Sequence, residues 1–387
     1  MKREVVIFIS NIIILFAACG CIINFSPYIS NQIISMVEFM DKLSNPYTNS
    51  KVVFAKISPF ISTKSDNNTN TTQEDDRQVM NSINSKDGFD NEDLLKTPAD
   101  IQALMDEEEQ VIDGQEEAGK TSEENYSGGG TIISFGNVQV QSKIPESFYD
   151  LNIENILNEG ANLTVKDPSK PTVLIYHSHT TESYTLLDVG YYTKSADLKT
   201  KSTERNMVRV GDEICRILEE RGIGVVHDRE IHDENYTGAY DSSRQSVEKY
   251  LEEYPSVEIT IDVHRDSITY KDGTKVKPTQ IVNGKKAAKM MIISGCEYNR
   301  VKNFPYWRDN LHFSAAVTNQ INSEYEGLMR PILFSERKYN MDLTKNSFLL
   351  EVGTEANTLD EACYSGRLFA NALADLILEN YVSKENE

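Results

Sequence analysis

The sequence has little of what marks a nucleic-acid-binding or a disulfide-stabilised protein. Its 387 residues include 39 Lys and Arg against 60 Asp and Glu, so the net charge is −21 and a polyanion would be repelled. Of the five cysteines, Cys19 and Cys21 lie in an apolar N-terminal run, and the others show no paired zinc-ligand spacing (Cys215, Cys296 and Cys363). We therefore expect no nucleic-acid partner, no disulfide framework and no cysteine-based metal site.

The N-terminus carries one long hydrophobic run. Lys2 and Arg3 precede apolar residues from Val5 to Phe25, and about 20 such residues can cross a bilayer as a helix. The positive flank predicts a cytoplasmic N-terminus, so residues 1–27 are expected to anchor a single-pass protein whose remaining chain is extracytoplasmic. A signal peptide cleaved near residues 17–19 and a lipid-modified cysteine are the alternatives.

Two further segments separate this anchor from the patterned part of the chain. Residues 28–62 mix apolar and polar side chains, which allows a short amphipathic helix near the membrane. Residues 63–130 are dominated by Asn, Thr, Ser, Asp and Glu, a composition that buries too little apolar surface to fold. We predict a disordered acidic linker there and one ordered domain over residues 131–387.

Strand and helix patterns alternate after residue 131. The predicted strands cover residues 131–135, 138–140, 173–176, 223–227, 257–263, 289–294, 332–334 and 347–352. The predicted helices cover residues 148–157, 203–222, 242–254, 307–325 and 358–381, the second of them capped by Ser202 and Thr203. This order predicts an α/β domain with a mainly parallel sheet flanked by helices on both faces.

Two of the predicted strands end in histidines. His177 and His179 follow the apolar strand at residues 173–176, and His264 follows the strand at residues 257–263. Functional groups of a parallel sheet collect at the carboxyl ends of its strands, so these histidines are expected to be neighbours. Two imidazoles at such an edge are candidate zinc ligands.

A catalytic zinc site needs a third protein ligand and a base for its water. Glu204, at the start of the helix after the first histidine strand, is the candidate ligand because His-His-Glu is a common set. Glu351 is the candidate base, since a carboxylate in an apolar strand is costly without a partner or a role. Taken alone, Glu204 would be an ordinary first-turn acid and Glu351 an ion-pair partner of Arg265 or Arg330.

The segment Tyr-His-Ser-His-Thr-Thr-Glu-Ser-Tyr at residues 176–184 resembles the signature of the stage II sporulation protein P family. Further similar segments lie at residues 262–266, 330–332, 339–343 and 350–357. That family consists of membrane-anchored peptidoglycan hydrolases of endospore-forming bacteria and is similar in fold to zinc-dependent N-acetylmuramoyl-L-alanine amidases. The resemblance implies an amidase-like fold, Zn²⁺ as cofactor and peptidoglycan as substrate.

The amidase pattern also implies roles for individual residues. It assigns the metal ligands His179, Glu204 and His264 and the catalytic Glu351, with His177 as an alternative first ligand or a support for it. The candidates for substrate binding are Glu182, Arg265, Arg330 and Asn340. Arginine suits this task because its planar fork matches a carboxylate.

The implied activity is hydrolysis of the amide between N-acetylmuramic acid and L-alanine, with endopeptidase action on stem-peptide cross-links. The resemblance places it in septal wall remodelling during sporulation and engulfment, with stage II sporulation proteins D and M as partners. The alternatives are a zinc carboxypeptidase or other peptidase of the same fold and a non-catalytic wall-binding scaffold. A full ligand set together with Glu351 argues against a scaffold.

Overall fold

The computed structural model describes residues 91–126, 129–194, 196 and 198–383. The predicted anchor at residues 1–27, the juxtamembrane segment at 28–62 and the first part of the predicted linker, residues 63–90, lie outside these ranges. Within them, no helix combines the length and the apolar character that crossing a membrane requires.

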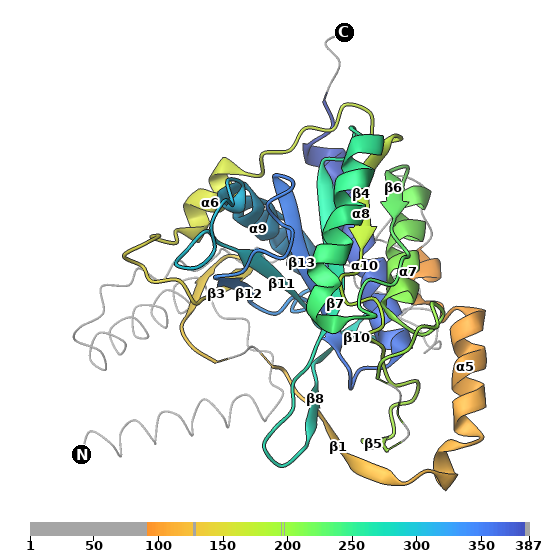
Figure 1. Cartoon of the computed structure of the whole chain (residues 1–387). Coiled ribbons are helices and arrows are strands. Elements are labelled where there is room, and N and C mark those ends of the chain that lie inside the picture. The colour runs from red at the N-terminus through yellow and green to blue at the C-terminus, as the bar shows by residue number, and fades with distance from the viewer. Residues whose placement is uncertain (1–90, 127–128, 195, 197, 384–387) are drawn as a thin grey trace, which may run out of the picture. The chain divides into compact units, whose positions relative to one another are not determined.

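An eight-stranded sheet lies at the centre of the described residues, in the order β2-β3-β12-β11-β13-β7-β4-β6 (Figure 1). Its strands are β2 (Ile132–Phe135), β3 (Val138–Ser142), β4 (Pro171–Tyr176), β6 (Gly224–His227), β7 (Ile259–Asp266), β11 (Met290–Gly295), β12 (Ile332–Ser335) and β13 (Asn346–Thr354). Most neighbours are parallel, but β11 is antiparallel to β13 and β2 is antiparallel to β3. The sheet is therefore mixed, and the predicted parallel arrangement holds for β13-β7-β4-β6 and for β3-β12-β11.

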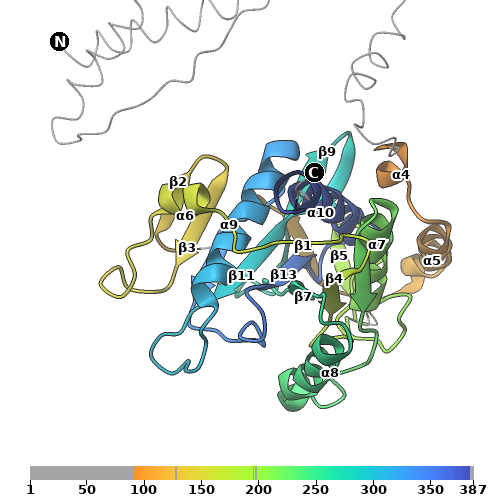
Figure 2. The same ribbon diagram turned by 90° about the horizontal axis from the view of Figure 1, so that it is seen from above.

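Helices cover both faces of this sheet (Figure 2). The helices α7 (Met207–Glu220), α9 (Trp307–Glu324) and α10 (Leu359–Asn380) pack on one face, and α8 (Ala239–Glu253) packs on the other. The short α6 (Ile153–Glu159) lies against α9. All nine residues of β13 are buried, as expected of a central strand that is covered on both faces.

The prediction of a disordered linker is wrong for residues 91–126. They form α4 (Asn91–Leu95), α5 (Ala99–Glu109), a 3₁₀ turn (Ile112–Gly114) and β1 (Glu117–Glu123), which we call the N-terminal arm. The strand β1 pairs with β5 (Tyr191–Thr193) and β8 (Lys275–Lys277). Leu94 and Ile101 are buried in the main hydrophobic core, so two apolar side chains of this polar segment pack against the domain.

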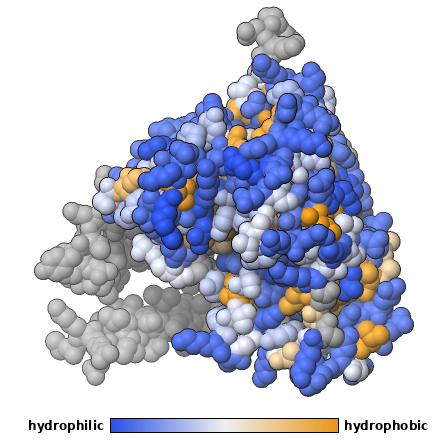
Figure 3. Space-filling model, in the orientation of Figure 1, coloured by the Kyte–Doolittle hydropathy of each residue, from blue (hydrophilic) through white to orange (hydrophobic). Residues whose placement is uncertain are grey.

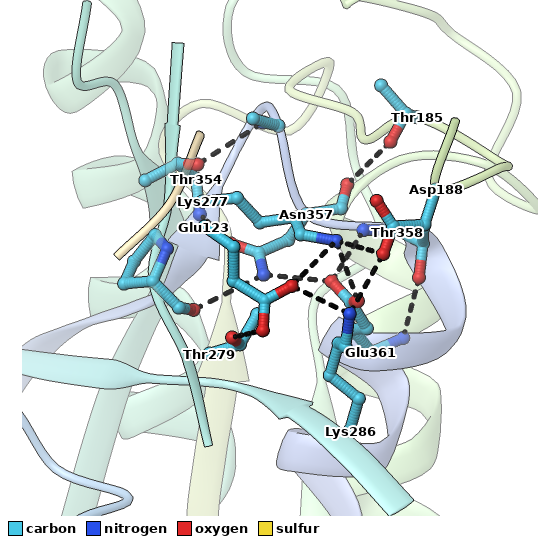
Figure 4. Close-up of polar contacts among 12 residues, drawn as sticks. Glu123, Thr185, Asp188, Lys277, Thr279, Lys286, Thr354, Asn357, Thr358 and Glu361 are labelled. Carbon is cyan, nitrogen blue, oxygen red and sulfur yellow. Dashed lines mark hydrogen bonds and ion pairs between the residues drawn. The ribbon is translucent and has the colours of Figure 1, made fainter. Parts of the chain in front are cut away.

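A polar network ties this arm to the start of α10 (Figure 4). Lys277 of β8 is almost fully buried and binds Glu361 at 3.2 Å and Asp188 at 2.5 Å. Glu123 of β1 binds Lys286 at 2.7 Å, from the hairpin of β9 (Thr279–Val282) and β10 (Lys285–Ala288). The carboxylate partners of Lys277 offset the free-energy cost of burying its charge. The same contacts hold the N-terminal arm in register with β8 and α10.

Candidate active site

Three strand ends bring the predicted site residues to one edge of the sheet. The strands β13, β7 and β4 are parallel neighbours, and Glu351 of β13 lies directly beside His264 of β7. His179 follows β4 by three residues, in the turn that the chain makes as it leaves the sheet. The expectation that the two histidine strands end side by side is therefore confirmed.

The rings of His179 and His264 face each other edge to face. Their centroids are 5.3 Å apart and their planes are perpendicular. Nδ1 of His179 is buried and has no hydrogen-bond partner among the described residues. His264 Nε2 lies 2.8 Å from Oδ1 of Asp262 but without hydrogen-bond geometry. Nδ1 of His179 is thus a buried nitrogen that a further partner could satisfy, whereas Nε2 of His264 already faces the Asp262 carboxylate.

The electrostatic environments of these two histidines differ. Burial lowers the pKa of His179 to about 4, and the neighbouring His264 adds to the shift. Burial acts the same way on His264, but the carboxylate of Asp262 outweighs it and raises the pKa to about 9. At neutral pH the site therefore holds one neutral imidazole and one imidazolium, whose proton a metal ion could replace.

Asp262 is a site residue that the sequence reasoning did not single out. It is fully buried and accepts hydrogen bonds from the backbone N–H of Ser178 at 2.8 Å and from the Ser178 hydroxyl at 2.6 Å. It thereby ties the turn after β4 to β7 and orients His264. Strand alternation could have revealed it, because residues 262 and 264 must lie on the same face.

Glu351 is held in an unfavourable environment for a carboxylate. Its side chain is 9% exposed, and its Oε2 has no hydrogen-bond partner within the described ranges. Burial raises its pKa to about 8, and repulsion from Asp266 adds to this. A carboxyl group with a pKa near neutrality is suited to accept and return a proton at physiological pH.

His177 is buried and already has partners for both ring nitrogens. Its Nδ1 lies 2.9 Å from the carbonyl oxygen of Val263, and its Nε2 lies 2.9 Å from Nε2 of His227. His227 in turn contacts Asp212 at 3.1 Å. A Cβ at Gly211 would lie 2.6 Å from the His177 ring, so the close packing requires glycine there. His179 is thus the histidine of this motif with a nitrogen left to bind a ligand.

The carboxylate nearest to His264 on this turn is Glu182. Its Oε2 lies 3.7 Å from Nδ1 of His264, and burial raises its pKa. Glu204 lies in the turn before α7 and is exposed, because the helix begins at Met207 with Asn206 as its N-cap rather than at the predicted Ser202 and Thr203. In the described part of the chain, no three His, Cys, Asp or Glu side chains are grouped closely enough to hold a metal ion as they stand.

Three tyrosines that the sequence analysis missed form a wall of the site. Tyr236, which begins a 3₁₀ turn (Tyr236–Gly238), stacks on His179 with centroids 4.4 Å apart. Tyr240 lies edge-on to His179 and stacks on Tyr339 at 4.6 Å. Tyr339 has a φ of 44°, a left-handed conformation that is rare for a bulky residue. Tyr236 and Tyr339 lie in turns and Tyr240 is the second residue of α8, so no periodic pattern of the sequence marks the three as one group.

Two of the predicted substrate-binding residues make hydrogen bonds within the protein. The Arg265 guanidinium donates to the carbonyl oxygens of Ser183 at 2.6 Å and Leu198 at 2.8 Å. Asn340 donates from its side-chain amide to the Tyr240 carbonyl oxygen at 3.0 Å. Arg330 differs from them: one guanidinium nitrogen binds Asp266 at 2.9 Å, while Nε is buried with no hydrogen-bond partner among the described residues.

The sequence can now be compared with known families. The sequence model of the stage II sporulation protein P family matches residues 42–374. The chain belongs to this family. The stage II sporulation protein P of Bacillus subtilis (strain 168) is 31% identical over 265 residues, which cover 63% of this chain and 61% of that relative. The resemblance that the motifs indicated is therefore confirmed.

Solved structures similar to this chain include two amidases. The N-acetylmuramoyl-L-alanine amidase AmiC2 of Nostoc punctiforme is 15% identical, with a TM-score of 0.33, over 54% of this chain and 96% of that one. The CwlD amidase from Clostridioides difficile, solved in complex with the GerS lipoprotein, is 9% identical, with a TM-score of 0.34, over 54% of this chain and 100% of that one.

Proposed function

We propose that this member of the stage II sporulation protein P family is a zinc-dependent N-acetylmuramoyl-L-alanine amidase that remodels peptidoglycan during sporulation. The observation that carries the proposal is the meeting of His179, His264 and Glu351 at one sheet edge, where His179 Nδ1 and Glu351 Oε2 are buried without a hydrogen-bond partner among the described residues. Such atoms are costly unless a ligand satisfies them. Imidazole nitrogens and a nearby carboxylate are the donor set that zinc prefers.

The zinc ligands in this proposal are His179, His264 and a carboxylate. The contact of Glu182 with His264 at 3.7 Å supports Glu182, whereas the order of motifs along the chain supports Glu204. When bound, zinc would supply a Lewis acid that polarises the scissile carbonyl and acidifies water. Asp262 would orient His264, as a carboxylate behind a metal-binding histidine commonly does.

Glu351 performs the proton transfers in this mechanism. It takes a proton from the attacking water, whose oxygen bonds to the carbonyl carbon of the muramic acid lactyl group. The carbon–nitrogen bond then breaks, and Glu351 returns the proton to the departing nitrogen of L-alanine. The products are a muramic acid carboxylate and a stem peptide with a free amino terminus. Endopeptidase action on cross-links would use the same groups.

Family membership supports three further parts of the proposal. Residues 1–27 would anchor the protein in the cell membrane with its N-terminus in the cytoplasm. The domain would then face the sporulation septum and the space between the membranes. Stage II sporulation proteins D and M would be its partners there.

Digestion of purified peptidoglycan tests the activity. The full chain is incubated with chelator or with added zinc, and the released products are identified by mass spectrometry. Stem peptides that begin with L-alanine, lost with chelator, support the amidase. Scission of cross-links alone would support a peptidase of the same fold, and no release with any metal would support a wall-binding scaffold.

A further inference from the structure

A polar cavity lies on the same sheet edge as Glu351. It has a volume of about 420 Å³, and six of its lining residues are Asn125, Tyr126, Asn137, Gln139, Lys289 and Arg330. Cavities of several hundred Å³ are large enough for a small ligand or one or two residues of a peptide. The N-terminal arm contributes to its wall through Asn125 and Tyr126.

The direction of β11 brings this cavity close to the candidate active site. Because β11 is antiparallel to β13, its first residues lie beside the last residues of β13, and the Gly353 N–H donates to the Lys289 carbonyl oxygen at 3.1 Å. Arg330 precedes β12, which is parallel to β11, so it lies at the same edge, and its backbone N–H donates to the Met290 carbonyl oxygen at 2.7 Å.

The cavity has two buried cations, and only one of them pairs with a carboxylate among the described residues. Lys289 and Arg330 are each 5% exposed. Arg330 pairs with Asp266, but Lys289 has only the neutral Asn125 oxygen at 2.5 Å as a side-chain partner in the part of the chain described. Burial lowers the pKa of Lys289, and the charge of Arg330 lowers it further. Glu326 also lines the cavity, from an exposed position.

An anionic ligand would satisfy both cations. Arg330 Nε is buried without a hydrogen-bond partner among the described residues, although the guanidinium pairs with Asp266 through another nitrogen. Lys289 is buried without a carboxylate partner among the described residues, and a buried cation without a counter-charge is costly. Side-chain amides of Asn137 and Gln139 line the same cavity. Arginine and lysine with neutral amides form a typical carboxylate-binding set.

We propose that this cavity binds a free carboxylate of the peptidoglycan stem peptide, with Lys289 and Arg330 as its cationic partners; the identity of the peptide rests on the proposed amidase function. Neighbouring strands lie about 5 Å apart, so β11 and β12 are about 5 and 10 Å from β13. An extended peptide advances about 3.5 Å per residue. The carboxylate is thus that of the second or third residue beyond the scissile bond.

Binding of defined peptides tests the proposal without requiring turnover. The probe is L-alanyl-γ-D-glutamyl-L-lysine with its carboxylates free, compared by calorimetry with the same peptide converted to its amides. The full wild-type chain should bind the free acid at least about tenfold more tightly. In Lys289→Met, which keeps the apolar stem and removes one of the two cations, this preference should fall clearly below the wild-type value. Arg330→Lys, which keeps a cation for Asp266, should weaken binding of the acid.

The control is Arg300→Gln. Arg300 is 85% exposed, pairs with Glu336 and follows β11 at the opposite sheet edge. The Arg300→Gln variant should therefore keep the wild-type preference for the free acid. Three results would overturn the proposal. The wild type could bind acid and amide equally, it could bind neither, or a folded Lys289→Met variant could keep the wild-type preference. Peptidoglycan digestion tests the proposed amidase activity separately. Cleavage without a preference for the free acid would support the amidase and contradict the role of the cavity. A preference for the free acid without cleavage would support carboxylate binding in the cavity and contradict the amidase.

Discussion

At the scale of single residues, the site is defined by side chains that are buried without complete partners. His179 and Glu351 each have such an atom among the described residues, although buried polar groups in folded proteins are nearly always satisfied. His177, two residues from His179, has both nitrogens occupied. The sequence left these two histidines as alternatives, because both follow the same strand and only tertiary contacts distinguish them.

The buried Glu351 should make stability depend on pH. Its pKa is raised from 4.5 to about 8, so the folded state holds this proton more tightly than the unfolded state. The stabilisation is present below about pH 4.5 and is lost as the pH rises through about 8. In metal-stripped protein, the wild type should lose on the order of 3 to 4 kcal/mol relative to Glu351→Gln between about pH 5 and 8.5.

Urea unfolding of the two proteins at several pH values measures this difference. The neutral glutamine retains the shape of the side chain but does not titrate. The stability of the Glu351→Gln variant therefore lacks the pH-dependent contribution of residue 351. A difference that stays constant across the pH range would mean that Glu351 is ionised in the folded state at ordinary pH, contrary to the account.

Zinc binding should distinguish Glu182 from Glu204. A metal that binds only the folded state stabilises it by about 2.7 kcal/mol at a free concentration 100 times the Kd. Adding zinc to the metal-stripped full chain should therefore raise its melting temperature. Glu182→Gln and His264→Ala should lose most of this rise, and Glu204→Gln should keep it because Glu204 is exposed and precedes α7.

His312→Ala serves as the control for the histidine variant. His312 lies on α9 and its Nδ1 is 3.1 Å from the Gly160 carbonyl oxygen, so its removal should leave the zinc-dependent rise intact. If Glu204→Gln abolishes the rise and Glu182→Gln does not, the ligand set inferred from the order of motifs is correct and the one favoured by contacts is wrong.

At the scale of elements, the sequence predicted best those strands and helices that are apolar and long. The strand β13 and the helix α10, with its Thr358–Glu361 capping box, have nearly the predicted bounds. The short strands β1, β5 and β8 were not predicted because they are polar and are held by pairing and by the Lys277 network. The reversal of β11 was also missed, since an apolar run carries no sign of its direction.

The N-terminal arm should contribute measurably to stability. Ile101 of α5 is fully buried, and replacing a buried isoleucine by alanine costs about 2–5 kcal/mol. Ile101→Ala should therefore lower the free energy of unfolding by that amount, whereas Val111→Ala, at a position 52% exposed, should change it by less than about 0.5 kcal/mol. Denaturant unfolding of both variants provides the comparison, and equal stability would contradict a packed arm.

At the scale of the whole molecule, the net charge does not favour an anionic substrate. The chain carries a net charge of −21, and most of the surface visible in Figure 3 is hydrophilic. Exposed large hydrophobic residues include Val111, Tyr236 and Ile281. A polymer that carries carboxylates gains no long-range attraction from such a protein. Recognition must therefore come from local groups such as the buried Lys289 and Arg330.

The family and the α/β architecture could be predicted from the sequence because the motifs are local and the strands are apolar. The wall of tyrosines and the cavity at Lys289 could not, since each depends on residues far apart in the chain that the mixed sheet brings to one edge. Arg265 shows the same limit: its motif suggested substrate binding, but its contacts are with Ser183 and Leu198.

The most direct test of the central claim is the turnover of a soluble muramyl peptide by wild type and Glu351→Gln, each loaded with zinc. General-base catalysis typically contributes about 10²–10⁴-fold, so Glu351→Gln should lose this factor in kcat while keeping the zinc-dependent rise in melting temperature. Glu336→Gln, on the opposite sheet edge, should keep full activity. Wild-type turnover by Glu351→Gln would contradict the assignment of Glu351 as the base and with it the proposed hydrolytic site.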